Sequence, residues 1–165
     1  MGKQAKAIVS LDIKNLIKEL NKALADEFLA AYQYWIGSKV VQGHFRNNVQ
    51  KELLEHSQDE FKHAQMLTDR ILQLDGTPIL DPKDWYKLTV CGFKAPKNYN
   101  SIAILKQNLQ GERCAIGVYN NLIKKYKGKD SITVHMFMHI LEEEVEHECD
   151  LETILKDIEV SKKKS

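Results

Sequence analysis

Two short motifs in this sequence combine residue types that bind metal ions. A glutamate is followed three residues later by a histidine at Glu60 and His63, and again at Glu144 and His147. In a helix, positions i and i+3 lie on one face, so each pair can offer a carboxylate oxygen and an imidazole nitrogen to the same ion. Buried carboxylates are costly unless a cation compensates them, so the motifs indicate an internal metal site.

Each motif has a partner glutamate at a matching distance from a turn. The midpoint between Glu27 and Glu60 falls at residues 43–44, and the midpoint between Glu112 and Glu144 falls at Gly128. Residues equidistant from the turn of an antiparallel helical hairpin lie at the same height. The spacing therefore predicts one metal centre built from six residues: Glu27, Glu60, His63, Glu112, Glu144 and His147.

The composition of this ligand set narrows the choice of metal ion. Four carboxylates and two imidazoles without a thiolate favour two iron ions per subunit, with manganese as the second choice, over a structural zinc ion. Two Fe(II) ions can each give one electron to dioxygen or hydrogen peroxide and polarise the bound oxygen species. The other acidic residues of the run 142–148 are expected to form a solvated face.

The remaining histidines are expected to be structural, because a lone histidine more often packs or hydrogen-bonds than binds a metal. His56 lies one turn before Glu60, which leaves a role beside the metals open for it. The histidines in this group are His44, His56, His135 and His139.

The elements that must position these residues follow from the apolar periodicity. Apolar residues recur at helical spacing and predict long helices over 11–42, 46–74, 101–127 and 132–159. The predicted fold is all-α, an antiparallel four-helix bundle made of two hairpins joined by a long crossover. The crossover carries all three prolines, and Asp81 could cap a short extra helix over 81–88. We expect a single domain over 1–165 with its core at about 11–159.

Charge and composition exclude several classes of partner. The chain has 24 basic and 23 acidic residues, so its charge alone indicates no nucleic acid or acidic substrate. The lysines at both ends (3, 6 and 162–164) are few, and DNA binding is not favoured. Because no apolar run is long enough to span a bilayer and no signal-peptide core is present, we expect a cytoplasmic protein with reduced cysteines.

The six residues and their order resemble the ferritin-like di-iron superfamily over nearly the whole chain. Among its branches the site is most similar to bacterioferritin, since both histidines are present and all six ligands come from one chain. In that comparison Tyr34 matches a tyrosine commonly found beside the centre, and an ordinary core aromatic is the alternative. Bacterioferritin usually has a haem-binding methionine where this chain has Phe61, so the resemblance implies no haem.

Other departures indicate a smaller cage. Only 18 residues follow His147, which leaves no room for the fifth helix of the large cages. The short crossover helix resembles the twelve-subunit Dps cage instead. A bacterioferritin-type site in a chain of this size resembles the Dps-like proteins called thioferritins, whose cysteine pair corresponds to Cys91 and Cys114. That resemblance implies a reversible disulfide that supplies electrons to the centre or senses its state, with two buried thiols as the alternative. Cys149 is expected to be inert packing.

Taken together, the resemblance implies an iron-storage and detoxification protein that protects against oxidative stress. It would act as a ferroxidase, oxidising Fe(II) with hydrogen peroxide or dioxygen and storing Fe(III) in a hollow homododecamer. The alternative is a peroxide-reducing oxidoreductase similar to rubrerythrin or manganese catalase. Ferritin cages often admit iron through acidic pores near the turn between the third and fourth helices. Here that turn, 124–129, is basic, so the resemblance does not define the route by which iron enters.

Overall fold

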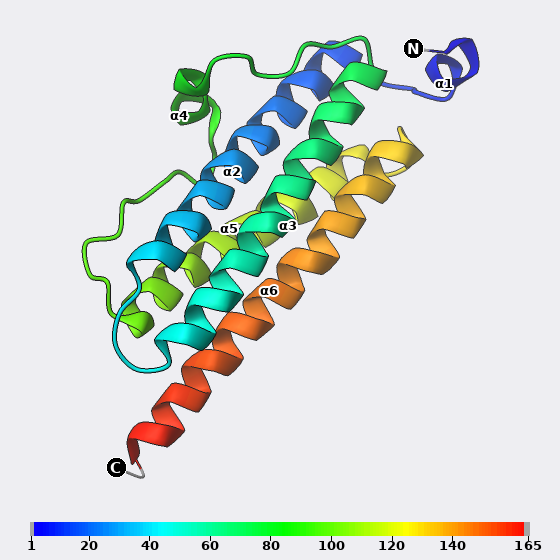
Figure 1. Ribbon diagram of the computed structural model, residues 1–165. Coiled ribbons are helices and arrows are strands. Elements are labelled where there is room, and N and C mark those ends of the chain that lie inside the picture. Colours follow the sequence, from blue (N-terminus) through cyan, green and yellow to red (C-terminus); the bar gives the residue numbers. More distant parts are fainter. Residues whose placement is uncertain (1, 164–165) are drawn as a thin grey trace.

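A computed structural model describes residues 2–163, and four long helices make up most of it (Figure 1). The predicted all-α bundle is confirmed. Within the described range, β structure is limited to one parallel bridge between Gln42 and Asn100. The elements in chain order are α1 (Lys3–Ala7), α2 (Ile13–Val40), α3 (Arg46–Gln73), the 3-10 helix η1 (Pro82–Asp84), α4 (Trp85–Leu88), α5 (Ser101–Tyr126) and α6 (Ser131–Lys163).

The predicted helix bounds agree with the structure to within two residues, except at the end of the fourth helix. There α6 continues to Lys163 rather than stopping at 159. The short crossover helix is present as η1 followed by α4, with Asp81 accepting a hydrogen bond from the Lys83 amide at 2.9 Å. The short N-terminal helix α1 has no counterpart among the predicted elements.

The turns and caps explain why the helices begin and end where they do. Gly43 and Gly128 have φ angles of 91° and 76°, a left-handed conformation that glycine adopts without steric cost. Asn100 caps α5 by accepting from the Ile102 amide at 3.1 Å. Asp130 accepts from the Thr133 amide at 3.2 Å at the start of α6. Gly43 and Gly128 thus close the two hairpins at the predicted turns, and Asn100 begins α5 after the crossover.

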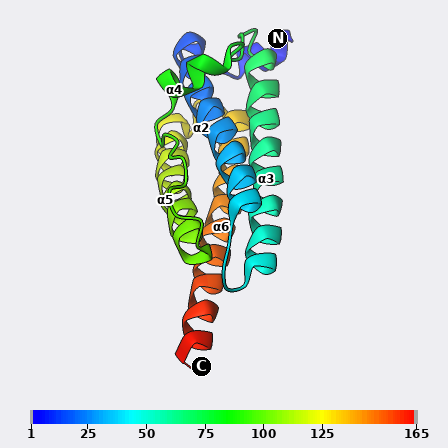
Figure 2. The ribbon, with the colours of Figure 1, turned by 60° about the vertical axis from the view of Figure 1, so that its left-hand side comes forward.

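The crossover returns the chain to the far end of the bundle before α5 begins. It passes along the face made by α2 and α5, as Figure 2 shows. At its end, the Gln42 amide donates to the Tyr99 carbonyl at 2.8 Å and the Ser101 amide donates to the Gln42 carbonyl at 2.9 Å. As a result α3 and α5 run in one direction, and α2 and α6 run in the other (Figure 1).

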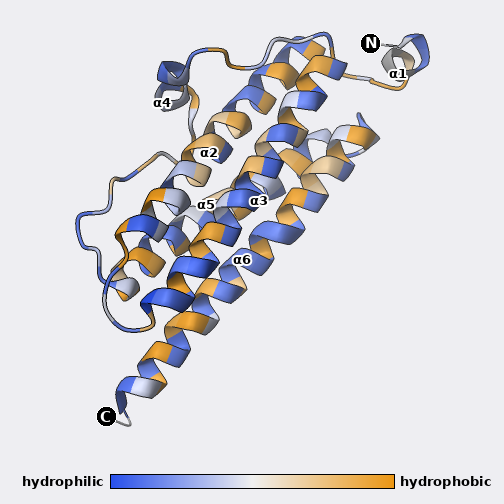
Figure 3. Ribbon diagram, viewed as in Figure 1, coloured by the Kyte–Doolittle hydropathy of each residue, from blue (hydrophilic) through white to orange (hydrophobic). Residues whose placement is uncertain are grey.

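Two apolar clusters fill the bundle, one toward each end. Hydrophobic and hydrophilic residues are interspersed along each helix (Figure 3). At helical spacing such a pattern gives each helix an apolar face, which packs inside the bundle. One cluster includes Leu20, Leu67 and Phe137, and the other includes Leu53 and Leu105. Each long helix therefore carries a stretch between the two clusters where polar side chains can lie inside the bundle.

A buried ion pair joins α3 to the start of α6. Arg70 Nη2 donates to Asp130 Oδ2 at 2.8 Å, and Arg70 Nε donates to Thr133 Oγ1 at 2.8 Å. Asp130 is 1% exposed, so removing its carboxylate would leave the arginine charge buried without its partner. We expect Asp130→Ala to lower the free energy of unfolding by about 3 to 5 kcal/mol in urea denaturation. Asp157→Ala, an exposed change on α6, should alter it by less than about 0.5 kcal/mol, and an equally small effect of Asp130→Ala would contradict the prediction.

No helix among residues 2–163 combines the length and apolar character that a bilayer crossing requires. The two basic termini are described in part. Lys3, Lys162 and Lys163 are exposed, whereas Lys164 and the side chain of Lys6 lie outside the described residues.

Candidate metal centre

The six residues singled out by spacing converge in the middle of the bundle, between the two apolar clusters. Glu27 comes from α2, Glu60 and His63 from α3, Glu112 from α5, and Glu144 and His147 from α6. Each of the six is at most 4% exposed. The polar layer is thus sealed above and below by leucine, isoleucine and aromatic side chains.

The ligand atoms form two groups, each centred on one histidine. Nδ1 of His63 lies 3.3 Å from Glu27 Oε2, 3.6 Å from Glu60 Oε2 and 3.3 Å from Glu144 Oε1. Nδ1 of His147 lies 3.7 Å from Glu60 Oε1, 3.8 Å from Glu112 Oε2 and 3.8 Å from Glu144 Oε2. Atoms bound about 2.1 Å from one ion stand roughly 3 to 3.5 Å apart, so both groups have near-coordination spacing.

Glu60 and Glu144 belong to both groups. Each places one carboxylate oxygen near His63 and the other near His147. Glu27 and Glu112 each belong to one of these two four-residue groups. The arrangement would therefore let Glu60 and Glu144 help to hold both of two cations, and Glu27 and Glu112 one each.

The hydrogen bonding of these groups shows whether the site suits a metal ion. Both Nδ1 atoms, and at least one oxygen of each of the four glutamates, are buried without a hydrogen-bond partner in the described part of the chain. Buried polar groups are normally satisfied, so this many orphaned acceptors at one place needs a ligand. Among the side chains that the structure describes, no lysine or arginine forms an ion pair with the four carboxylates, so the two histidines and bound cations are the available compensating charges.

Without a metal, protons balance the charge. Burial raises the pKa of Glu27 and of Glu112 well above the ordinary value, and the charges of Glu60 and Glu144 respectively raise it further. Burial opposes the imidazolium form of His147, but Glu112, Glu144 and Glu60 outweigh it and raise its pKa to about 12. Metal binding must therefore displace protons from these groups.

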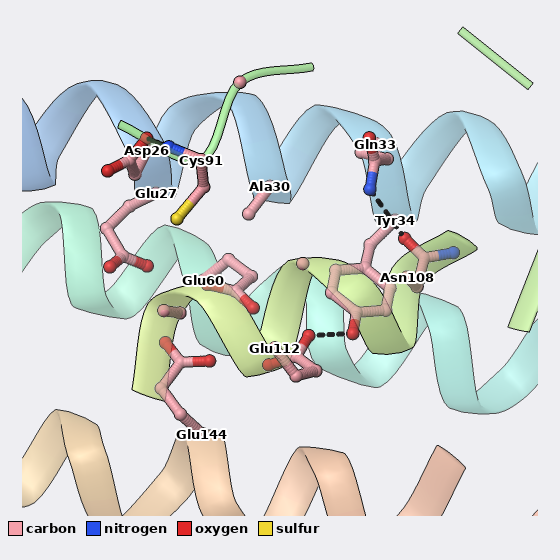
Figure 4. Close-up of a pocket in the computed structure, with 13 residues that line it drawn as sticks. Asp26, Glu27, Ala30, Gln33, Tyr34, Glu60, Cys91, Asn108, Glu112 and Glu144 are labelled. Atoms are coloured by element: carbon pink, nitrogen blue, oxygen red, sulfur yellow. Dashed lines mark hydrogen bonds between the residues drawn. The ribbon is translucent and has the colours of Figure 1, made fainter. Parts of the chain in front are cut away.

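Two tyrosines hold the terminal glutamates. The Tyr34 hydroxyl donates to Glu112 Oε1, as the close-up in Figure 4 shows, and the Tyr119 hydroxyl donates to Glu27 Oε1. Burial and the adjacent carboxylate raise the pKa of both phenols well above the ordinary value, so both remain donors. The resemblance described from the sequence indicated Tyr34. Tyr119 has the helical phase of a core residue, which gives no sign of its contact with Glu27.

The outer nitrogen of each histidine also faces a carboxylate. His63 Nε2 is 2.6 Å from Glu143 Oε2, and His147 Nε2 is 3.7 Å from Asp59 Oδ2. Partners of this kind fix the tautomer and ring orientation of a metal-binding histidine. The prediction that the residues around Glu144 form a simple solvated face is therefore wrong for Glu143, which reaches across from α6 to α3.

We expect Glu143→Gln to weaken metal binding without removing a ligand. The amide keeps the shape of the side chain but loses the charge that favours an Nε2–H donor on His63. Changes at such positions typically reduce metal affinity about 10- to 100-fold. Titration with Mn(II) measures the loss, and Glu142→Gln, an exposed neighbour, is the control. Equal affinities of the two variants would contradict this role.

The other histidines differ in position. His44, His135 and His139 are exposed on the surface. His56 is 3% exposed, and its ring stacks on that of His147 with centroids 4.0 Å apart. Of the four, His56 therefore contacts the centre.

A disulfide lies beside a pocket that reaches the centre. Cys91 in the crossover is bonded to Cys114 on α5, so the paired form holds here rather than two free thiols. Cys91 lines the same pocket as the four glutamates (Figure 4). The Asp26 carboxylate anchors this segment by accepting from the amides of Val90 and Cys91, each at 2.9 Å.

The third cysteine corrects a prediction made from the sequence. Cys149 was expected to be packed, but it is free and exposed on α6. Its helical position between His147 and Leu151 turns it away from the core.

Comparison with known proteins places this geometry in a family. The ferritin-like domain family matches residues 17–160. The chain belongs to the ferritin-like family. A Pyrococcus furiosus protein called DNA protection during starvation protein is 33% identical over 147 residues, which cover 88% of this chain and 79% of that protein.

Solved structures refine the relationship. A dodecameric thioferritin, the bacterioferritin-related protein from Bacteroides fragilis, superposes with a TM-score of 0.92 at 46% identity and covers 94% of this chain and 92% of that one. Bacterioferritin from Rhodobacter capsulatus gives a TM-score of 0.67 at 26% identity, with 87% and 84% of the chains covered. The resemblance to bacterioferritin-related, Dps-like proteins is thereby confirmed.

Proposed function

We propose that this protein is a ferroxidase that stores iron, oxidising Fe(II) at the six-residue centre and retaining Fe(III) inside a cage. The observation that carries the proposal is the pair of buried ligand groups that share Glu60 and Glu144. Its family membership and its similarity to a thioferritin and to bacterioferritin support the same function.

The residues at the centre have three roles in this proposal. Glu60 and Glu144 hold two iron ions close together, so that the two electrons needed to reduce one hydrogen peroxide or dioxygen come from one site. Tyr34 and Tyr119 fix the terminal carboxylates. His63 and His147 lose their Nδ1 protons to bind metal, while Glu143 and Asp59 face their outer nitrogens.

Twelve subunits form the proposed cage. An exposed apolar groove supports assembly: Tyr32, Trp35 and Phe61 line it and are 44 to 60% exposed. Apolar patches of this kind commonly mark contacts between proteins. The similarity to a dodecameric thioferritin supports this number of copies. We expect no haem, since Phe61 offers no atom that binds iron.

Iron loading of the purified protein tests this proposal. We expect a particle of twelve 19.0-kDa chains in light scattering, and an Fe(III) core that grows when Fe(II) is added with peroxide or dioxygen. A monomer or dimer would contradict the cage. Rapid peroxide loss without any retained iron would instead identify a rubrerythrin-like or manganese-catalase-like oxidoreductase.

The cysteine pair is the proposed redox partner of this centre. Oxidation of the two thiols to the disulfide releases two electrons and two protons, which match the reduction of two Fe(III) to Fe(II). We expect reduced wild-type protein to consume about one more peroxide per subunit than the doubly substituted Cys91→Ser, Cys114→Ser variant. Cys149→Ser, which removes the free thiol, should retain the extra equivalent. Equal peroxide consumption by wild type and the double variant would exclude the role.

A further inference from the structure

A second group of metal-binding side chains lies on the α3 and α6 side of the centre. Glu52 and His56 are one turn apart on α3, and Asp150 is on α6. One ligand atom from each of these three residues lies within 4.8 Å of the other two. The group opens into a pocket between α3 and α6, separate from the pocket lined by Cys91.

His56 is the residue that distinguishes this group from an ordinary acidic surface. It is 3% exposed, and its Nδ1 has no hydrogen-bond partner in the described part of the chain. Its Nε2 points to the carboxylates, 3.3 Å from Glu52 Oε1 and 4.0 Å from Asp150 Oδ2. The first distance is within, and the second slightly above, the roughly 3 to 3.5 Å that separates two atoms bound to one ion.

The surroundings fix His56 and attract cations. Its ring is held between that of His147, 4.0 Å away and nearly parallel, and the edge of Tyr34, 5.1 Å away. The pocket is lined by six carboxylates and by one lysine, Lys62, which pairs with Asp59 at 2.6 Å. This excess of negative charge raises the local concentration of cations.

We propose that Glu52, His56 and Asp150 bind a third divalent cation in each subunit. One imidazole and two carboxylates suit a borderline ion such as Fe(II), Mn(II) or Zn(II), with water completing the coordination. Glu52 and Asp150 have side chains 24% and 45% exposed, so this ion exchanges with solvent more readily than the two buried ones.

The third site would bind iron next to the dinuclear centre. Stacked rings connect the two, since His147 belongs to the centre and His56 to the third site. Passage of iron between them rests on the ferroxidase function proposed above, whereas cation binding at the third site does not.

Zinc binding tests this site, because Zn(II) is redox-inactive and accepts both imidazole and carboxylate. The assembled full-length protein is dialysed against Zn(II), and bound metal is counted per subunit. Zinc-edge anomalous diffraction then locates each ion. The test variant is the double change Glu52→Gln, Asp150→Asn. The control is Glu55→Gln with Glu146→Gln, which removes two charges from the same pocket but no proposed ligand.

We expect three ions per subunit in wild type and in the control, and two in the test variant, with affinity for the third at least tenfold weaker. An absent peak between Glu52, His56 and Asp150 in wild type would overturn the third site, as would three tightly bound ions in the test variant. Absence of the two inner peaks with the third present would contradict the dinuclear centre instead, so the two failures are distinguishable.

Discussion

Glu60→Gln is expected to reduce Fe(II) oxidation by more than about 100-fold, a larger effect than a change at a glutamate that belongs to only one ligand group. Glu60 places one oxygen near His63 and the other near His147, so the substitution would remove the proposed shared ligand from both proposed metal positions. Changes that only reorient a ligand cost about 10- to 100-fold in affinity or activity, and losing a shared ligand should exceed that.

The measurement is the initial rate of Fe(III) absorbance after anaerobic Fe(II) loading and addition of peroxide. Glu55→Gln introduces the same change five residues earlier on α3 at an exposed position and should keep the wild-type rate. Glu27→Gln affects one metal position and should lie between the two. A wild-type rate for Glu60→Gln would show that Fe(II) is not oxidised at this centre.

The bundle was predictable because its determinants are local. Apolar residues at helical spacing define the four long helices, and glycines with positive φ close the hairpins at Gly43 and Gly128. Matched distances from these turns then bring Glu27 opposite Glu60, and Glu112 opposite Glu144. The sequence predicted that the six residues meet, and their role as metal ligands stays a prediction for the experiments above.

The contacts around the six residues depend on packing between helices, so they were harder to predict from the sequence. Tyr119 has the phase of a core residue, yet its hydroxyl reaches Glu27. Glu143 sits in an acidic run typical of a solvated surface, yet its side chain crosses to His63. Helical phase gives the direction in which a side chain leaves its helix, but the neighbour it meets depends on how the helices cross.

Metal binding is expected to stabilise this protein strongly, because the metal-free centre holds four buried carboxylates close together. At a free metal concentration a thousand times the dissociation constant, each occupied site adds about 4 kcal/mol. Two sites should therefore raise the melting temperature by roughly 15 to 30 °C, at about 2 to 4 °C per kcal/mol for a chain of this size. Calorimetry with and without Mn(II) measures the shift.

Glu27→Gln separates metal-linked stability from ordinary packing. Burial, with the charge of Glu60 next, raises the pKa of Glu27 well above its usual value, so in the metal-free protein this carboxyl keeps its proton to higher pH than an ordinary glutamate. The amide has nearly the same shape, and its oxygen can still accept from Tyr119. The metal-free variant should therefore melt at or above the wild-type temperature but gain much less from Mn(II). A metal-free loss of about 2 to 5 kcal/mol, as for a core truncation, would mean that Glu27 serves packing rather than metal.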